Sequence, residues 1–139
     1  MALDFSIVIY MLTMIYETSK VFPICGDIIV NWMRMIEFFV GTSGWVYSWN
    51  EAGNLDWYVS NSGLNAVELN MSFYRFPLPS IVKSWSLKGK DLRRSIKVNR
   101  LITHDFKFNE RAFESWQRFH NLFHPLESYI DFYLFQLGP

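Results

Sequence analysis

This sequence has little cysteine, no net charge and no long hydrophobic run, and each of these absences argues against a class of protein. Cys25 is the single cysteine among 139 residues, so no disulfide can form within the chain, and we expect a reducing, cytoplasmic setting. Thirteen basic and thirteen acidic residues give a formal net charge of zero, which provides no general attraction to nucleic acid. The almost unbroken apolar run over residues 5–16 falls short of the ~20 residues that a membrane-spanning helix needs.

The glycines form none of the motifs that cradle a phosphate or expose a serine nucleophile. The sequence contains no G-x-x-x-x-G-K-[ST], no G-x-G-x-x-G and no G-x-S-x-G. Apolar residues are abundant instead: half of the residues are hydrophobic and 19% are aromatic. That composition and the length of the chain predict one folded domain.

Residues 1–34 differ in pattern from the rest, and they allow three interpretations. They form a membrane or targeting segment, an additional helix packed on the domain, or a stretch upstream of the true start of translation. Met33 and Met35 both offer later starts, and Met35 opens directly into a strand-like apolar run. We favour the third interpretation, and therefore assign residues 1–34 to an N-terminal extension and residues 35–139 to the domain.

From residue 38 onward, short apolar runs alternate with segments of helical periodicity. The sequence predicts strands over residues 38–42, 66–70, 93–100 and 130–137 and helices over residues 55–60, 81–87 and 110–123. Asn54, Ser80 and Asn109 precede the helices as expected N-caps. The last helix carries one apolar stripe, made of Phe113, Trp116, His120 and Phe123. This alternation predicts a parallel sheet with right-handed crossovers.

Four blocks in this order resemble the YecE-like family, also called domain of unknown function 72. They are Gly41-Thr42-Ser43-Gly44-Trp45 with Tyr47 and Trp49, residues 67–75 with Pro77 and Trp85, Lys97 followed by Ile102-Thr103-His104, and residues 134–137. The resemblance implies a fold similar to TIM barrels and a biochemical role that is not established. Such a barrel takes ~250 residues and eight strands. The expected fold class is therefore α/β, a parallel (β/α) TIM-barrel type with the first four strands only, a partial barrel.

In a TIM barrel the site lies at the C-terminal ends of the strands. Glu68, Lys97 and His104 meet that rule and are the candidate catalytic residues. Polar and aromatic neighbours are candidate ligand-binding residues: Thr42, Ser43, Trp45, Asn70, Tyr74, Arg75, Asn99, Thr103 and Gln136. Glu68 is either a general acid or base tuned by Lys97, or the partner of Lys97 in a structural pair. No metal site is expected, because too few ligands are present beside Glu68, His104 and Asp105.

Three further features each have a functional and a structural interpretation. His104 is a proton carrier or a hydrogen-bonded loop residue, and His120 is expected to pack on its helix. Trp45, Tyr47, Trp49, Phe73 and Tyr74 form either a stacking platform or a packed cap over the barrel mouth. A basic run of Lys88, Lys90, Arg93 and Arg94 lies before the third strand, where it forms either a nucleic-acid-binding patch or, as we expect, a solvated turn.

Together these residues predict an enzyme or binder of an unknown small molecule at the barrel mouth. The alternatives are a nucleic-acid-binding barrel that uses Arg75 and Arg100, or a non-functional truncated fragment. The sequence identifies no cofactor, reaction or substrate, and neither nucleic acid nor a membrane is an expected partner.

The strands of half a barrel predict self-association. The first and fourth strands leave open sheet edges, which invite other chains. Seven apolar residues belong to strands whose buried partners are partly missing: Val40, Val67, Leu69, Ile96, Val98, Leu134 and Leu137. We therefore expect the chain to aggregate or dimerise rather than to form a stable, active monomer.

Overall fold

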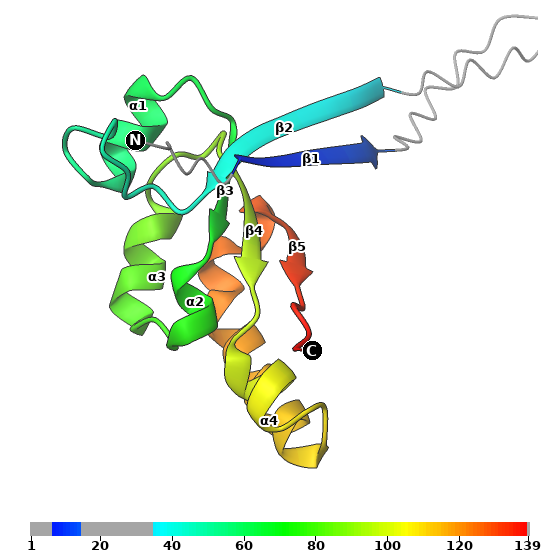
Figure 1. Ribbon diagram of the computed structural model, residues 1–139. Coiled ribbons are helices and arrows are strands. Elements are labelled where there is room, and N and C mark those ends of the chain that lie inside the picture. Colours follow the sequence, from blue (N-terminus) through cyan, green and yellow to red (C-terminus); the bar gives the residue numbers. More distant parts are fainter. Residues whose placement is uncertain (1–6, 15–34, 139) are drawn as a thin grey trace, which may run out of the picture.

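One five-stranded sheet organises the part of the chain that this computed structural model describes, residues 7–14 and 35–138 (Figure 1). The strands follow each other in space as they do in sequence: β1 (Ile7–Met14), β2 (Met35–Ser43), β3 (Ala66–Leu69), β4 (Arg93–Lys97) and β5 (Ile130–Leu134). The pairs β2–β3, β3–β4 and β4–β5 are parallel. The four parallel strands form an open sheet of the partial (β/α)-barrel type, which confirms the expected fold class.

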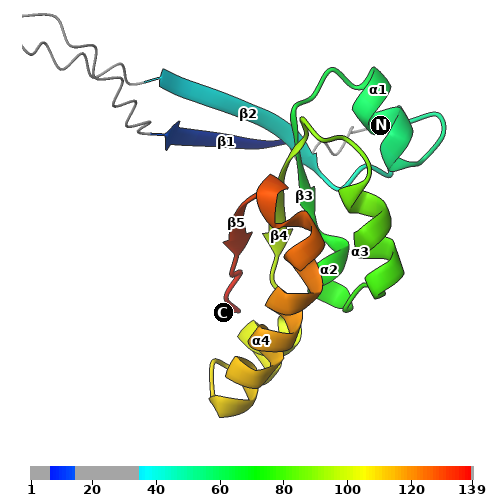
Figure 2. The same ribbon diagram turned by 180° about the vertical axis from the view of Figure 1, so that it is seen from behind.

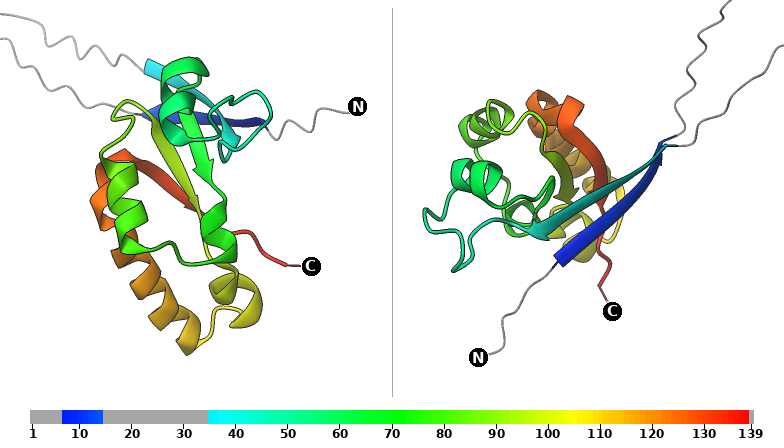
Figure 3. Two further views of the ribbon diagram at one scale, coloured as in Figure 1. Left: turned by 90° about the vertical axis from the view of Figure 1, so that its left-hand side faces the viewer. Right: turned by 90° about the horizontal axis from the view of Figure 1, so that it is seen from above.

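The connections between the parallel strands are helical, as the alternation of patterns predicted. They contain α1 (Leu55–Asn61), α2 (Met71–Tyr74), α3 (Pro79–Ser86), the π-helix η1 (Leu101–Asp105), α4 (Glu110–Phe123) and the 3-10 helix η2 (His124–Tyr129). Figures 2 and 3 show α1, α3 and α4 on the same side of the curved sheet. Among residues 7–14 and 35–138, none of the helices has the length and apolar character needed to cross a membrane.

β1 is the element that the sequence patterns did not predict. We considered an additional helix over the apolar run, but residues 7–14 form a strand that pairs antiparallel with β2, from Ile7 opposite Thr42 to Met14 opposite Met35. The helix interpretation is therefore wrong for these residues, where β-branched side chains favour a strand. β1 also occupies the edge of β2 that we expected to be open. The interpretations given to residues 15–34 lie outside the described residues.

The side chains of β2, β3 and β4 divide between two faces of the sheet. The register places Ser43, Glu68 and Ser95 side by side in one row across the three strands. Because successive side chains on a strand alternate, Val67 and Leu69 point to the opposite face.

That opposite face carries the hydrophobic core. Val67, Leu69, Ile96 and Val98 are at most 2% exposed and pack in one cluster with residues of the helices, including Val82 and Phe119. Our expectation that these four strand residues had lost their buried partners was wrong, because they face the helices and not the barrel interior. Each contributes ~1.5–3 kcal/mol through this burial, and that contribution does not depend on closing the barrel. Leu134 and Leu137 remain exposed.

Two of the three predicted helix caps are confirmed. The Asn54 side chain accepts a hydrogen bond from the Trp57 N–H at 2.9 Å, and the Asn109 side chain accepts one from the Ala112 N–H at 3.1 Å. Ser80 is not a cap, because α3 begins at Pro79 with Leu78 as its N-cap residue. Proline suits the first helical position, since the N–H that it lacks would have no partner there.

The buried face of α4 differs from the predicted stripe by about one residue. Phe113 is 61% exposed, whereas Ala112, Phe119 and Phe123 are buried. The stripe at Phe113 and His120 and the buried face at Ala112 and Phe119 both repeat at helical spacing, so periodicity alone did not distinguish them. His120 packs against the rings of Trp116 and Tyr133, which confirms its expected packing role.

Arg93 and Arg94 of the basic run belong to β4 and are built into the fold, so the expected solvated turn is wrong for them, whereas Lys90 is exposed. The Arg94 guanidinium, 1% exposed, donates hydrogen bonds to the carbonyls of Leu92 (2.6 Å) and Lys88 (2.6 Å). Burial lowers the pKa of Arg94 to about 10, although Tyr129 opposes that shift. Arg93 forms an ion pair with Asp131 of β5, with the Arg93 Nε 2.9 Å from the carboxylate.

Candidate functional site

A polar cluster lies where β2 and β3 end, and Glu68 is its centre. The Ser43 hydroxyl donates a hydrogen bond of 2.7 Å to Glu68 Oε1, and Glu68 is only 5% exposed. The backbone holds this residue firmly, because its carbonyl accepts hydrogen bonds from the N–H groups of Gly44 (2.8 Å) and Asn70 (3.0 Å). The structure thus brings together Ser43, Glu68 and Asn70, three residues that the sequence placed in the site.

Asn70 itself ends the strand and does not extend it. The predicted strand over residues 66–70 stops at Leu69, and Asn70 has helical backbone angles as the N-cap residue of α2. Its side-chain oxygen is buried and accepts no hydrogen bond from the protein. A buried amide oxygen without a donor is costly, and this one belongs to a residue two positions after Glu68 in the chain.

Lys97 and His104 meet at the ring of Phe73 in α2. The Lys97 ammonium lies 5.0 Å from the centre of that ring, and the His104 ring stands edge-on to it at 5.3 Å. His104 Nδ1 is 2.7 Å from the Thr103 hydroxyl. The backbone of Gly138 passes close to the other side of the imidazole, since a side-chain carbon added at Gly138 would lie 3.2 Å from His104 Cδ2.

The structural pair between Glu68 and Lys97 does not form. Among the ion pairs of residues 38–138 none joins these two side chains, and Glu68 hydrogen-bonds to Ser43 instead. The register explains the difference, because Ser95 lies opposite Glu68 and Lys97 is two residues further along β4. One repeat along a strand is ~6.6 Å, so Lys97 lies one layer nearer the mouth. The interpretation of Glu68 and Lys97 as each other's partner is wrong; an acid–base role stays a prediction.

The side chains of Thr42 and Asn99 form their hydrogen bonds with other groups of the protein. The Thr42 hydroxyl lies 2.6 Å from the Gly44 carbonyl and 3.1 Å from the Tyr58 hydroxyl. The Asn99 amide donates to the Ser72 carbonyl at 2.8 Å and accepts from the Leu101 N–H at 3.1 Å. Both side chains are buried, and they position the segments that leave β2 and β4.

Two positioning residues were missed by the sequence patterns. The Tyr58 hydroxyl in α1 donates to the Ala66 carbonyl at 2.8 Å, and burial raises the pKa of Tyr58 while the hydrogen bonds with Thr42 lower it. Ser72 is fully buried, and its hydroxyl lies 2.7 Å from the Lys97 carbonyl. The only available signal for Ser72 was a small polar residue three positions after the end of β3. Nothing local distinguished Tyr58 from the other aromatic residues.

The aromatic residues after β2 pack as a cap against α1 and α3. Trp45 contacts Trp85 edge-on at 5.6 Å, and Tyr47 stacks on Trp49 at 5.4 Å. Trp49 also lies 5.9 Å from the Tyr58 ring. These contacts support the packed-cap interpretation for the Trp45–Trp49 part of the group. Tyr74, Arg75 and Gln136 are exposed.

No metal-binding cluster was found within the described part of the chain, where no group of three or more His, Cys, Asp or Glu side chains could hold an ion. Asp105, which we considered beside Glu68 and His104, lies 3.5 Å from the Arg100 guanidinium.

Comparison with known proteins identifies one family. The family model described as Protein of unknown function DUF72 matches residues 39–139, well over half of the chain. No curated protein and no solved structure matches the sequence.

Proposed function

We propose that this chain, which belongs to the family of proteins of unknown function DUF72, binds a small polar molecule at the C-terminal ends of β2, β3 and β4. The observations that carry the proposal are the buried Glu68 carboxylate, held by Ser43, and the unsatisfied amide oxygen of Asn70, two residues later in the chain. Sites in parallel α/β folds lie at this end of the strands, and polar groups gathered there fix the orientation of a ligand.

The chemistry of the site favours a ligand with hydrogen-bond donors at one end and an acceptor or anionic group at the other. Glu68 and Asn70 supply acceptors, so they match hydroxyl or ammonium groups. Lys97 and His104 supply donors one layer nearer the mouth. In this proposal Glu68 and His104 perform acid–base chemistry, and Lys97 holds the negative end of the ligand.

The test uses the full chain and a panel of amino acids, hydroxy acids and sugars. We expect at least one compound to raise the melting temperature and to shift the NMR signals of the Gly44 and Asn70 amides. Glu68→Gln keeps an acceptor for Ser43 but removes the charge, so it should weaken binding ten- to a hundredfold, since hydrogen bonds to charged groups contribute ~1.5–3 kcal/mol.

Glu51→Gln is the matched control, because Glu51 is exposed in the loop after β2. It should bind the same compound as the wild type does. Equal affinity in the Glu68→Gln and wild-type chains, or shifts confined to amides away from these strand ends, would contradict the proposal.

We also propose that the chain self-associates through β5, the last strand of the sheet. Within the described residues β5 pairs only with β4. Leu134, its last residue, is 37% exposed, and Leu137 in the segment that follows is 63% exposed. Strand edges of this kind invite pairing with another chain. Sedimentation at increasing protein concentration should show dimers, and Leu134→Lys should shift the equilibrium toward monomer. A chain that stays monomeric at every concentration would contradict this proposal.

The single cysteine, Cys25, supports a cytoplasmic location as part of the same proposal. Fractionation of cells that produce the chain tests this location, and recovery outside the cytoplasm would overturn it.

A further inference from the structure

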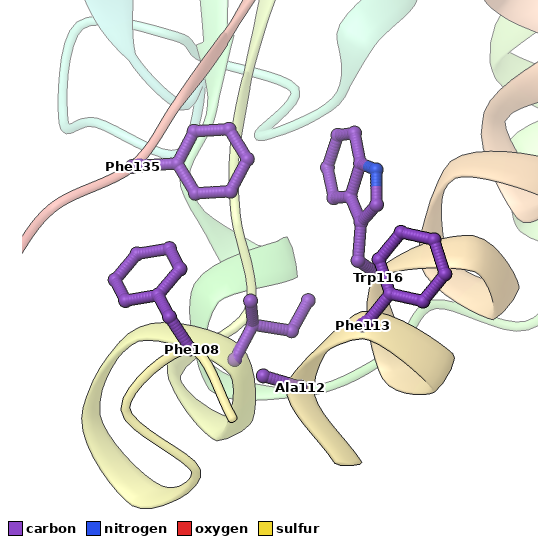
Figure 4. Close-up of a pocket in the computed structure, with 6 residues that line it drawn as sticks. Phe108, Ala112, Phe113, Trp116 and Phe135 are labelled. Atoms are coloured by element: carbon purple, nitrogen blue, oxygen red, sulfur yellow. The ribbon is translucent and has the colours of Figure 1, made fainter. Parts of the chain in front are cut away.

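An apolar pocket of about 260 Å³ lies beside η1, and none of its lining residues belongs to the polar cluster at Glu68. It is bounded by η1, the first turns of α4 and the segment that follows β5. Its lining is entirely hydrophobic: Ile102, Phe108, Ala112, Phe113, Trp116 and Phe135. Figure 4 shows the four aromatic rings around one shared space, with Ala112 below them.

The rings at the rim are unusually accessible for aromatic side chains. Phe108 is 54% exposed, Phe113 is 61% exposed and Phe135 is 40% exposed. Exposed apolar side chains that converge in one place mark sites of interaction, whereas scattered ones need no explanation. These three residues lie in the loop before α4, in α4 and after β5, so it is the tertiary structure that brings them together.

The walls of the pocket are held in place by contacts behind them. The Trp116 ring lies 5.1 Å from Phe135 on the pocket side, and it also contacts Tyr133 edge-on at 5.1 Å. Phe108 lies 6.0 Å from Phe135. A pocket whose walls are already positioned loses little side-chain entropy when a ligand enters.

The backbone that carries Phe108 is in an unusual conformation. Lys107 and Phe108 are non-glycine residues with φ angles of 46° and 61°, and a positive φ is rare for a bulky side chain. The Phe108 N–H donates to the Ile102 carbonyl at 3.2 Å, which ties the loop back to η1. Strained backbone of this kind clusters at ligand-binding sites.

We propose that this pocket binds a planar aromatic molecule of one or two fused rings. A cavity of ~150 Å³ with apolar walls accommodates benzene, so the larger volume here fits an indole-sized or naphthalene-sized ring system. Aromatic walls favour an aromatic occupant, because offset-stacked and edge-to-face contacts add to the burial of apolar surface. No charged side chain lines the pocket, which favours a neutral ligand or the neutral ring of a larger one.

This site goes beyond the polar site proposed above and is tested independently of it. The two are nevertheless close in the chain, because Ile102 lines the pocket and His104, two residues later in η1, contacts Phe73. Irregular helical turns such as η1 often occur at functional sites.

The experiment is a titration of the full chain with indole, followed by NMR. We expect saturable shifts of the Phe108, Ala112 and Phe135 amides, with a Kd below about 1 mM, which corresponds to the weakest binding that one buried ring system provides. Phe113→Ala should weaken indole binding at least fivefold. Phe113 is exposed, so this variant is expected to fold, and circular dichroism checks that it does.

Leu87→Ala is the matched control, since Leu87 is an exposed hydrophobic residue of similar accessibility away from the pocket. It should bind indole as the wild type does. Three results would overturn the proposal: no saturable shifts in the wild type, equal indole affinity in Phe113→Ala, or equal affinity for the non-planar cyclohexanol. The Leu134→Lys chain separates this site from the self-association proposed for β5: if the same amides still shifted with protein concentration in that chain without ligand, this surface would be a contact between copies of the chain, and the proposal would also be overturned.

Discussion

Gly41→Ala should destabilise the protein by more than about 3 kcal/mol, the upper end of what overpacking costs. Gly41 lies in β2 directly beside Ala66 of β3. A side-chain carbon at Gly41 would overlap the carbonyl group of Ala66 and would lie 3.0 Å from the Val67 nitrogen. These atoms belong to the backbone, so no side chain can rotate to make room. The two strands would have to separate where they make their few parallel pairs, next to Glu68.

Gly53→Ala provides the comparison for Gly41→Ala in chemical denaturation. Gly53 has a φ of +60° and open space around it, so alanine there costs only the ~1–2 kcal/mol of a left-handed backbone. We expect Gly41→Ala to lower the free energy of unfolding clearly more than Gly53→Ala does. Ligands of the Glu68 site should also no longer raise the melting temperature of the Gly41→Ala chain. Similar losses in the two variants would show that the close approach of β2 and β3 is not a constraint.

Arg94→Met should cost about 2–4 kcal/mol, because it leaves buried carbonyl groups without donors. The Arg94 guanidinium bonds the carbonyls of Lys88, Gly89 and Leu92 and lies 3.4 Å from that of Trp85. It therefore supplies hydrogen-bond donors to the carbonyl groups at the end of α3 and in the turn into β4. Methionine fills a similar volume but donates no hydrogen bond. Removing the charge relieves part of the desolvation that lowers the pKa of Arg94, which keeps the expected loss below that of a fully unpaired buried charge.

Lys90→Met is the matched control for Arg94→Met, since Lys90 belongs to the same basic run and is exposed. It should change the free energy of unfolding by less than ~0.5 kcal/mol, as is usual for surface substitutions. Urea denaturation of both variants measures the difference. If Arg94→Met were as stable as Lys90→Met, the guanidinium would not be the cap of α3 that its contacts indicate.

The sequence predicted those features that depend on neighbouring residues. The caps at Asn54 and Asn109 were correct because each bond spans three residues and the geometry is the same in any helix. The order of strands and helices was correct because period-two and helical patterns are also local. The expected gathering of polar residues at the strand ends followed from that order, and Ser43, Glu68 and Asn70 do come together there.

Features that depend on residues distant in the sequence were missed or wrongly predicted. The short helix α2 replaces the predicted end of a strand, and Ser72 within it hydrogen-bonds to Lys97, 25 residues away. β1 pairs with β2 across residues 15–34, and no local pattern specifies a partner at that separation. Both errors concern hydrogen bonds between residues that come close to each other only when the chain folds.

By itself, the amino-acid sequence determined that this is a parallel α/β chain of the DUF72 family with a polar cluster at its strand ends. Only the tertiary structure decided which partner each polar residue has. Glu68 bonds to Ser43 rather than to Lys97 because the strand register places Ser95 opposite Glu68 and Lys97 one layer further along β4. Arg94 is a buried cap rather than a solvated charge because the end of α3 lies against β4. Register and packing are set by the whole core at once, and a one-residue shift of a strand would turn all the side chains of that strand to the opposite face of the sheet.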